Sequence, residues 1–280
     1  MARYFIEIEF NGSDFSGWQL QPEAKTVEGA IEQAFETILQ RPIDLVGQGR
    51  TDAGVHATAQ IAHVDLTEND WNRLGQSGII SENLVAEMSL LLHRANRMLS
   101  PNVFLRSMRR VKEVTHARFD AISRCYEYRV LTEPSPILSH QSWYPGFRSD
   151  LEQLEPLATA LLGEHDFDAI SKTNPDNFTT ICTIYESSWT LEGKVLVYRV
   201  KANRFLRNMV RRLVGSMVQL VRGNDPLIGQ TIKMIAGNQL NSHNPDHLWI
   251  EQLKDHQKFT APAEALYLVA VHYASDCYTD

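Results

Sequence analysis

Residues 47–57 read Gly-Gln-Gly-Arg-Thr-Asp-Ala-Gly-Val-His-Ala and separate two segments that have the pattern of β-strands. Ile43–Val46 is predicted as a short strand, and residues 62–66 alternate between apolar and polar side chains. Glycine permits positive φ and close backbone approach, so Gly47, Gly49 and Gly54 predict a tight loop that holds Asp52 beside Arg50. Glycine and aspartate are equally typical of an ordinary hairpin loop, so the loop alone does not establish a site.

The segments around this loop predict the order β-α-β-β-α-β. Residues 3–10 alternate with the period of two of a half-buried strand, and Thr26 is placed to cap an amphipathic helix over 27–39. A second helical pattern spans 84–99, stops at Pro101 and is followed by a strand over 103–111. This order is the ferredoxin-like arrangement.

The second half of the chain repeats that order. The predicted elements are a strand over 126–130, a helix over 151–162, strands over 184–191 and 195–201, helices over 205–223 and 225–237, and a strand over 266–273. We therefore expect an α+β fold of two ferredoxin-like lobes, with antiparallel or mixed sheets flanking a basic central cleft. The expected lobes are residues 1–110, which carry the Asp52 loop, and residues 111–280.

Composition limits the class of protein. The 280 residues are 43% hydrophobic and 22% charged, which is ordinary for a globular protein. A net charge of −7 argues against general nucleic-acid coating, so any RNA site is a local basic surface. Cys125, Cys182 and Cys277 form no C-x-x-C motif and fit a reducing cytoplasm. Without a signal segment or a run of roughly 20 apolar residues, we expect a soluble protein without membrane association.

Two groups of side chains suggest RNA. Arg204, Arg207 and Arg211 are spaced i, i+3 and i+7 at and after the start of the predicted long helix, which indicates either a solvated stripe or a phosphate-binding surface. Further basic residues near the lobe junction are Arg106, Arg109, Arg110, Lys112, Arg118, Arg124 and Arg129. Tyr126 and Tyr128 share one face of a strand, where they either fill the core or stack on a flipped base.

A metal site is disfavoured. Asp52, His56 and His63 are conceivable ligands, but none of these three residues belongs to an i, i+4 histidine pair or to an E-x-x-H element. The sequence also contains no G-x-x-x-x-G-K-[ST] phosphate loop and no G-x-S-x-G nucleophile elbow.

Residues 49–57, Gly-Arg-Thr-Asp-Ala-Gly-Val-His-Ala, resemble the signature of the TruA family of tRNA pseudouridine synthases. Further segments resemble family motifs in family order, from about residue 3 to residue 273. They are Gly17-Trp18-Gln19 with Gln21-Pro22, His116-Ala117-Arg118-Phe119, Arg124-x-Tyr126-x-Tyr128, Gly163-x-His165-Asp166-Phe167, Asn208-Met209-Val210-Arg211 and Leu266-Tyr267-Leu268.

The resemblance implies isomerisation of uridine to pseudouridine in the anticodon stem-loop of tRNA, at positions 38 to 40, by a homodimer without metal or organic cofactor. By resemblance, Asp52 is the essential carboxylate, Arg50 and Arg211 are its ionic neighbours, and Tyr126 stacks on the target base. The expected substrate contacts also include Leu266, Arg118, Arg207 and His56.

The chemistry fits these residue types and leaves alternatives open. An ionised carboxylate can attack carbon or remove a sugar proton, and arginine neighbours keep it charged in a water-poor site. Cys182 stands where many relatives have arginine and Ala265 where glycine is common, which affects RNA contacts outside the central site. The alternatives are a catalytically silent RNA-binding or chaperone protein on the same scaffold, and a metal hydrolase using Asp52 and His56.

Overall fold

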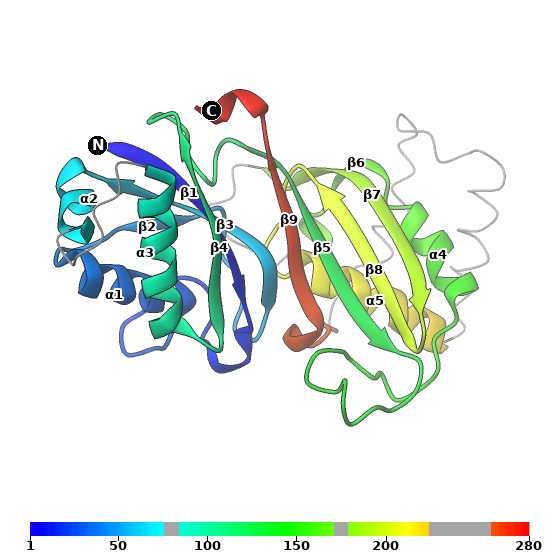
Figure 1. Ribbon diagram of the computed structural model, residues 1–280. Coiled ribbons are helices and arrows are strands. Elements are labelled where there is room, and N and C mark those ends of the chain that lie inside the picture. Colours follow the sequence, from blue (N-terminus) through cyan, green and yellow to red (C-terminus); the bar gives the residue numbers. More distant parts are fainter. Residues whose placement is uncertain (76–83, 171–178, 224–258, 280) are drawn as a thin grey trace. The chain divides into compact units, whose positions relative to one another are not determined.

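A computed structural model of the chain describes residues 1–75, 84–170, 179–223 and 259–279 (Figure 1). They form two compact units, Met1–Ile122 with Leu268–Asp280 and Ser123–Tyr267. Residues 111–122 and 268–280 thus group with the first unit, whereas the sequence-based division assigns them to the second lobe. That 1–110 and 111–280 are the functional lobes stays a prediction.

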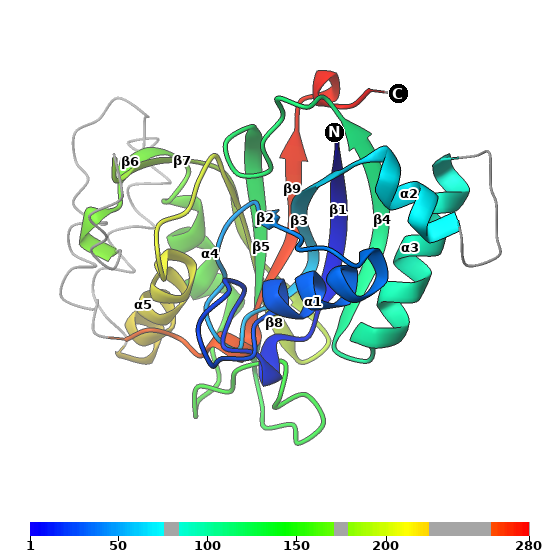
Figure 2. The same cartoon turned by 90° about the vertical axis from the view of Figure 1, so that its left-hand side faces the viewer.

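The first unit is a sheet with helices on one face. Strand β1 (Ala2–Phe10) pairs antiparallel with β3 (His56–Leu66) on one side and β4 (Val103–Val111) on the other, and the short β2 (Leu45–Gly47) pairs with β3. Strand β9 (Leu266–Tyr273) follows β3 in the strand order. Helices α1 (Val27–Leu39), α2 (Glu68–Gly75) and α3 (Leu84–Leu99) lie together against the sheet (Figure 2).

Local sequence explains these elements. The Thr26 side chain accepts the Gly29 N–H at the start of α1, as the capping pattern predicts, and the apolar face of that helix is buried. Tyr4 of β1 meets Trp71 of α2 edge to face, with ring centroids 5.5 Å apart. The neighbouring Phe5 faces the opposite side of the pleated strand, where it packs with Val111 and Ala117. Both faces of β1 are therefore covered.

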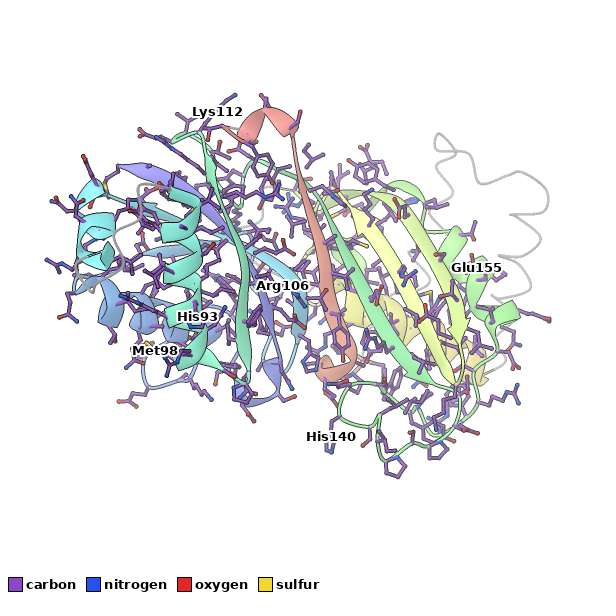
Figure 3. All side chains as sticks on the ribbon, viewed as in Figure 1. His93, Met98, Arg106, Lys112, His140 and Glu155 are labelled. Carbon is purple, nitrogen blue, oxygen red and sulfur yellow. The ribbon has the colours of Figure 1, made fainter. Side chains whose placement is uncertain are left out.

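The second unit is also antiparallel. Its strands are β5 (Ala121–Leu131), β6 (Gly163–Asp166), β7 (Ile181–Glu192) and β8 (Val195–Ala202), in the order β5-β8-β7-β6. Helix α4 (Leu151–Thr159) packs on β7, where its Glu155 carboxylate accepts the Trp189 N–H at 2.5 Å (Figure 3). Helix α5 (Met209–Gly223) is buried around most of its circumference, and Gly215 lets it approach the backbone at Phe259.

The predicted mixed α+β class with mostly antiparallel strands is confirmed, whereas several boundaries are wrong. Helix α5 begins at Met209, so Arg204 and Arg207 precede it and the predicted basic stripe does not form on this helix. Helix α4 ends at Thr159, and the sequence did not predict α2 or β6. The predicted helix over 225–237 lies outside the described residues. Within the described ranges, no helix is long and apolar enough to cross a membrane.

Candidate functional site

The loop that carries Asp52 is anchored through its backbone. The Asp52 carbonyl accepts the Val55 N–H at 3.2 Å, and the preceding Thr51 carbonyl accepts the Trp18 N–H at 3.2 Å. Gly54 has φ +83°, a conformation that favours glycine. These contacts hold Asp52 in a turn directly before β3, with its side chain half-buried.

The other two glycines of the loop behave differently from the prediction, because neither has a positive φ. A Cβ at Gly47 would lie 2.4 Å from the Trp18 indole nitrogen, so this glycine makes room for a buried ring. A Cβ at Gly49 would meet nothing within 4 Å. Of the three glycines, the backbone conformation therefore requires only Gly54, and packing requires Gly47.

Residues 12–18 pack directly against the loop, a contact between distant segments that no local sequence pattern predicts. A Cβ at Gly12 would lie 2.0 Å from the Val55 carbonyl oxygen, and one at Gly17 would lie 2.6 Å from the Thr51 carbonyl oxygen. The Gly12 N–H also donates to Nδ1 of His56 at 3.1 Å. His56 is buried and holds this segment to β3, while its predicted contact with substrate remains a prediction.

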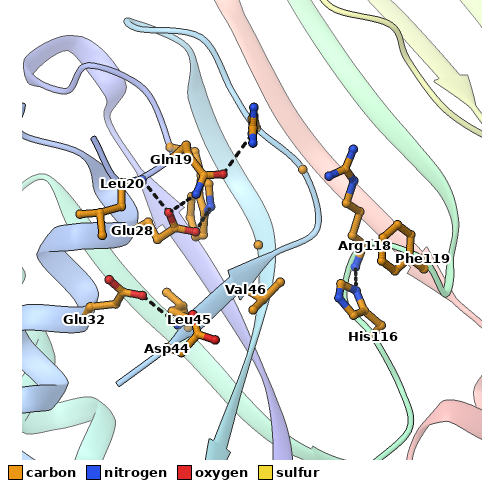
Figure 4. A pocket seen from close by; sticks show the side chains of 14 residues that line it. Gln19, Leu20, Glu28, Glu32, Asp44, Leu45, Val46, His116, Arg118 and Phe119 are labelled. Atoms are coloured by element: carbon orange, nitrogen blue, oxygen red, sulfur yellow. Dashed lines mark hydrogen bonds between the residues drawn. The ribbon is translucent and has the colours of Figure 1, made fainter. Parts of the chain in front are cut away.

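A buried carboxylate connects α1 to Arg50 (Figure 4). Glu28 accepts the Trp18 indole N–H at 3.1 Å, the Gln19 side-chain amide at 2.9 Å and the Leu20 N–H at 2.6 Å. The side-chain oxygen Oε1 of Gln19 in turn accepts the Nε–H of Arg50 at 3.1 Å. Burial raises the pKa of Glu28, and the N–H donors favour its charged form. The only sequence signal for this role is an acidic residue in the first turn after the Thr26 cap.

The two tyrosines of the predicted aromatic pair separate into different environments. Tyr128 is fully buried, and its hydroxyl donates to the Pro262 carbonyl at 2.9 Å, so it belongs to the core. Tyr126 is half-buried and meets Phe205 edge to face, with ring centroids 5.0 Å apart. Of the pair, Tyr126 is thus the one whose burial suits a contact with substrate.

The remaining candidate residues of the second unit have distinct positions. Nε of Arg211, on α5, donates to the Ala261 carbonyl at 2.7 Å. Leu266 is buried at the start of β9, and Arg207 is exposed in the turn before α5. The structure places these residues and Tyr126 in the second unit, and Asp52, Arg50, His56 and Arg118 in the first.

Part of the basic cluster inferred from the sequence is neutralised by acidic partners. Arg106 of β4 pairs with Glu9 of β1 (Figure 3), and Arg129 lies 3.7 Å from the carboxylate of Glu127. Arg129 also stacks over Tyr267, 4.1 Å from its ring centroid. The local positive charge near these strands is therefore smaller than the count of arginines indicates.

The described residues offer no metal site, since no three His, Cys, Asp or Glu side chains among them are grouped as ligands. His63 is buried, and its Nδ1 accepts the Ala117 N–H at 3.1 Å. Burial lowers the pKa of His63 to about 4, so the ring is neutral at pH 7 and has a structural role.

Comparison with known proteins decides the family. A family described as tRNA pseudouridine synthase matches residues 157–274. A protein of Parabacteroides distasonis named tRNA pseudouridine synthase A is 35% identical over 280 residues, covering 99% of this chain and 98% of the relative. The chain belongs to the tRNA pseudouridine synthase A family. The family resemblance inferred from the motifs is thereby confirmed.

Other members of the tRNA pseudouridine synthase A family are similarly close. The protein of Chlorobaculum tepidum is 39% identical, covering 78% of this chain and 82% of the relative. The protein of Bacteroides thetaiotaomicron is 34% identical, covering 100% of this chain and 94% of the relative. A solved structure entitled "Crystal Structure of a Cbf5-Nop10-Gar1 Complex" matches at 10% identity with a TM-score of 0.30, covering 77% of this chain and 54% of that one. This structural similarity is too weak to support a conclusion.

Proposed function

We propose that this chain isomerises uridine to pseudouridine in tRNA, within the anticodon stem-loop, and that Asp52 is its essential carboxylate. The observation that carries this proposal is the similarity over nearly the whole chain to proteins named tRNA pseudouridine synthase A. The anchored turn that presents Asp52 beside the Arg50 segment supports the role of this residue. The catalytically silent alternative gains no support, because the carboxylate, both arginines and the tyrosine are all retained.

The proposed reaction is an isomerisation. The N1–C1′ bond of the uridine breaks, the uracil turns, a C5–C1′ bond forms, and the proton on C5 is replaced by one on N1. Asp52 either attacks carbon or removes a sugar proton, and both routes need its ionised form. Arg50 and Arg211 are the proposed ionic neighbours of Asp52, while Tyr126 holds the detached base by stacking. The reaction consumes no oxidant or second substrate, so the proposal includes no metal or organic cofactor.

The proposal also covers the two lobes, the homodimer and the further contacts to RNA. Residues 1–110 and 111–280 act as two ferredoxin-like lobes that contribute Asp52 and Tyr126 to the same nucleotide, and the enzyme works in the cytoplasm as a homodimer. Arg118, Arg207, His56 and Leu266 provide further contacts to the RNA. The exposed positions of Arg118 and Arg207 support phosphate contacts.

The proposal is tested by incubating the purified full-length chain with an unmodified tRNA transcript and mapping pseudouridine along it. We expect pseudouridine in the anticodon stem-loop, and none in a matched transcript whose stem-loop uridines are replaced by cytidine. Turnover should be unchanged in EDTA, because no step uses a metal. Binding of tRNA without any pseudouridine would support the catalytically silent alternative instead.

A further inference from the structure

A pocket of about 300 Å³ lies within the first unit, next to the segment that carries Arg50. Gln19 and Val46 lie on one side, and His116, Arg118 and Phe119 lie on the facing side (Figure 4). Arg50 also lines the pocket. Its volume is at the lower end of that of small-ligand sites, which suits a single nucleotide. The proposed function gives Arg118 a phosphate contact but assigns no base to this pocket.

Phe119 is exposed although its own segment is firmly held. Its side chain is 75% exposed, whereas Ala117, two residues earlier, is fully buried. The segment is fixed by three hydrogen bonds: His116 N–H to Asp120 at 2.6 Å, Arg118 N–H to Nδ1 of His116 at 3.1 Å, and Ala117 N–H to His63. A ring presented by such an ordered turn does not need to become ordered when it binds a ligand.

Phe119 forms a platform of two rings and a cation together with His116 and Arg118. The His116 and Phe119 ring centroids lie 4.4 Å apart at an angle of 38°, and the Arg118 guanidinium carbon lies 5.7 Å from the Phe119 centroid. Aromatic rings beside arginine are the surface on which proteins stack unpaired RNA bases. This arrangement therefore favours a base as the occupant.

The charges around the pocket indicate how a nucleotide would lie. The lining includes two cations, Arg50 and Arg118, and three carboxylates, Glu28, Glu32 and Asp44. A phosphate is attracted to the arginines and repelled by the carboxylates. The sugar-phosphate backbone would then follow Arg118 and Arg50 while the base rests on Phe119.

We propose that Phe119 and His116 form a stacking platform for an unpaired tRNA base other than the reacting uridine, with Arg118 contacting the adjacent phosphate. This inference rests on the proposed function, because it takes tRNA as the substrate. It adds a binding subsite to the Asp52 loop, and Phe119 acts in substrate affinity and takes no part in the chemical step.

The test compares steady-state isomerisation of unmodified tRNA by variants at this position. Removing one stacked base contact costs about 1–3 kcal/mol, so Phe119→Ala should raise KM about 5-fold or more and leave kcat within about twofold. Phe119→Trp should retain the wild-type KM, and Phe119→Leu, which is apolar but not aromatic, should resemble Phe119→Ala. Phe104→Ala is the matched control, because Phe104 is 49% exposed on β4 and does not line the pocket.

Three results would overturn the platform. The first is an equal KM for Phe119→Ala and Phe104→Ala. The second is a wild-type KM for Phe119→Leu. The third is a change of oligomeric state in Phe119→Ala, which would show that the ring contacts protein. If wild-type protein makes no pseudouridine, the proposed function fails. Fluorescence anisotropy of labelled tRNA with the same variants then tests the platform separately, and we expect a Kd about 10-fold weaker for Phe119→Ala alone.

Discussion

Replacing Glu28 with glutamine should destabilise the protein by about 2 kcal/mol. The carboxylate receives three N–H donors, one on Oε1 and two on Oε2. In its best orientation, a glutamine keeps the two donors at the Oε2 position and turns its own amide N–H towards the Trp18 indole. One buried donor then lacks an acceptor, at a cost of about 1–3 kcal/mol, and the two remaining hydrogen bonds lose their charge assistance, about 1 kcal/mol each.

A compensating effect reduces this cost. Burial raises the pKa of Glu28, so the native protein bears a desolvation cost for the charged carboxylate that the neutral amide removes. The net loss of about 2 kcal/mol corresponds to a fall in Tm of about 4–8 °C. The assay is urea unfolding followed by tryptophan fluorescence at pH 7.

The matched control is Glu36→Gln on the same helix. Glu36 is exposed and accepts a single N–H, that of Ile43 at 3.3 Å, which a glutamine oxygen can also accept. We expect this control to change the free energy of unfolding by less than about 0.5 kcal/mol. If Glu28→Gln is no less stable than Glu36→Gln, the Trp18, Gln19 and Leu20 donors do not depend on the charge of Glu28, and the reasoning is refuted.

Three further predictions follow from other contacts. The free energy of unfolding should fall by up to about 3 kcal/mol as the pH drops from about 6.5 to 4. The reason is that the pKa of His63 is about 4 in the folded state and has its ordinary value when unfolded. In urea unfolding, the difference in this free energy between pH 7 and pH 5 should be smaller for His63→Gln than for wild type. Gly12→Ala should prevent stable folding because its Cβ would meet the Val55 carbonyl at 2.0 Å, whereas Gly49→Ala should melt within a few degrees of wild type; similar Tm values for both would contradict this packing. Affinity for tRNA should fall about 100-fold between about 50 and 200 mM salt if roughly four phosphates are contacted. Arg207→Gln should lower the slope of log affinity against log salt concentration by about one. An unchanged slope would exclude Arg207 from phosphate binding.

Sequence patterns predicted the elements that depend on local periodicity. Helix α1 has a capping threonine and one apolar face, and β9 spans Leu266–Tyr273, the range predicted from the sequence. Helix α5 was harder to delimit, because the apolar spacing continues through Phe205 and Leu206 although these residues precede the helix. Leu206 is buried without being helical, so burial alone produced the misleading pattern.

The site could be predicted only where a motif marks it. The resemblance identified the Asp52 loop, but the roles of Gly12, Gly17 and Glu28 depend on contacts between segments far apart in the chain, which no local period reveals. Cys182 is expected from the resemblance to affect RNA contacts outside the central site. It is fully buried, and burial raises its thiol pKa to about 11, so this position supplies an apolar packing group.

The most direct test of the central claim is tritium release from C5-labelled uridine in unmodified tRNA by wild-type protein and by Asp52→Asn. The asparagine keeps the shape of the side chain and removes its charge, and Asp52 is only half-buried, so both proteins should unfold at similar temperatures. We predict that wild-type protein releases tritium and that Asp52→Asn does so at least about 100-fold more slowly. Equal release by the two proteins would contradict the assignment of Asp52 as the essential carboxylate.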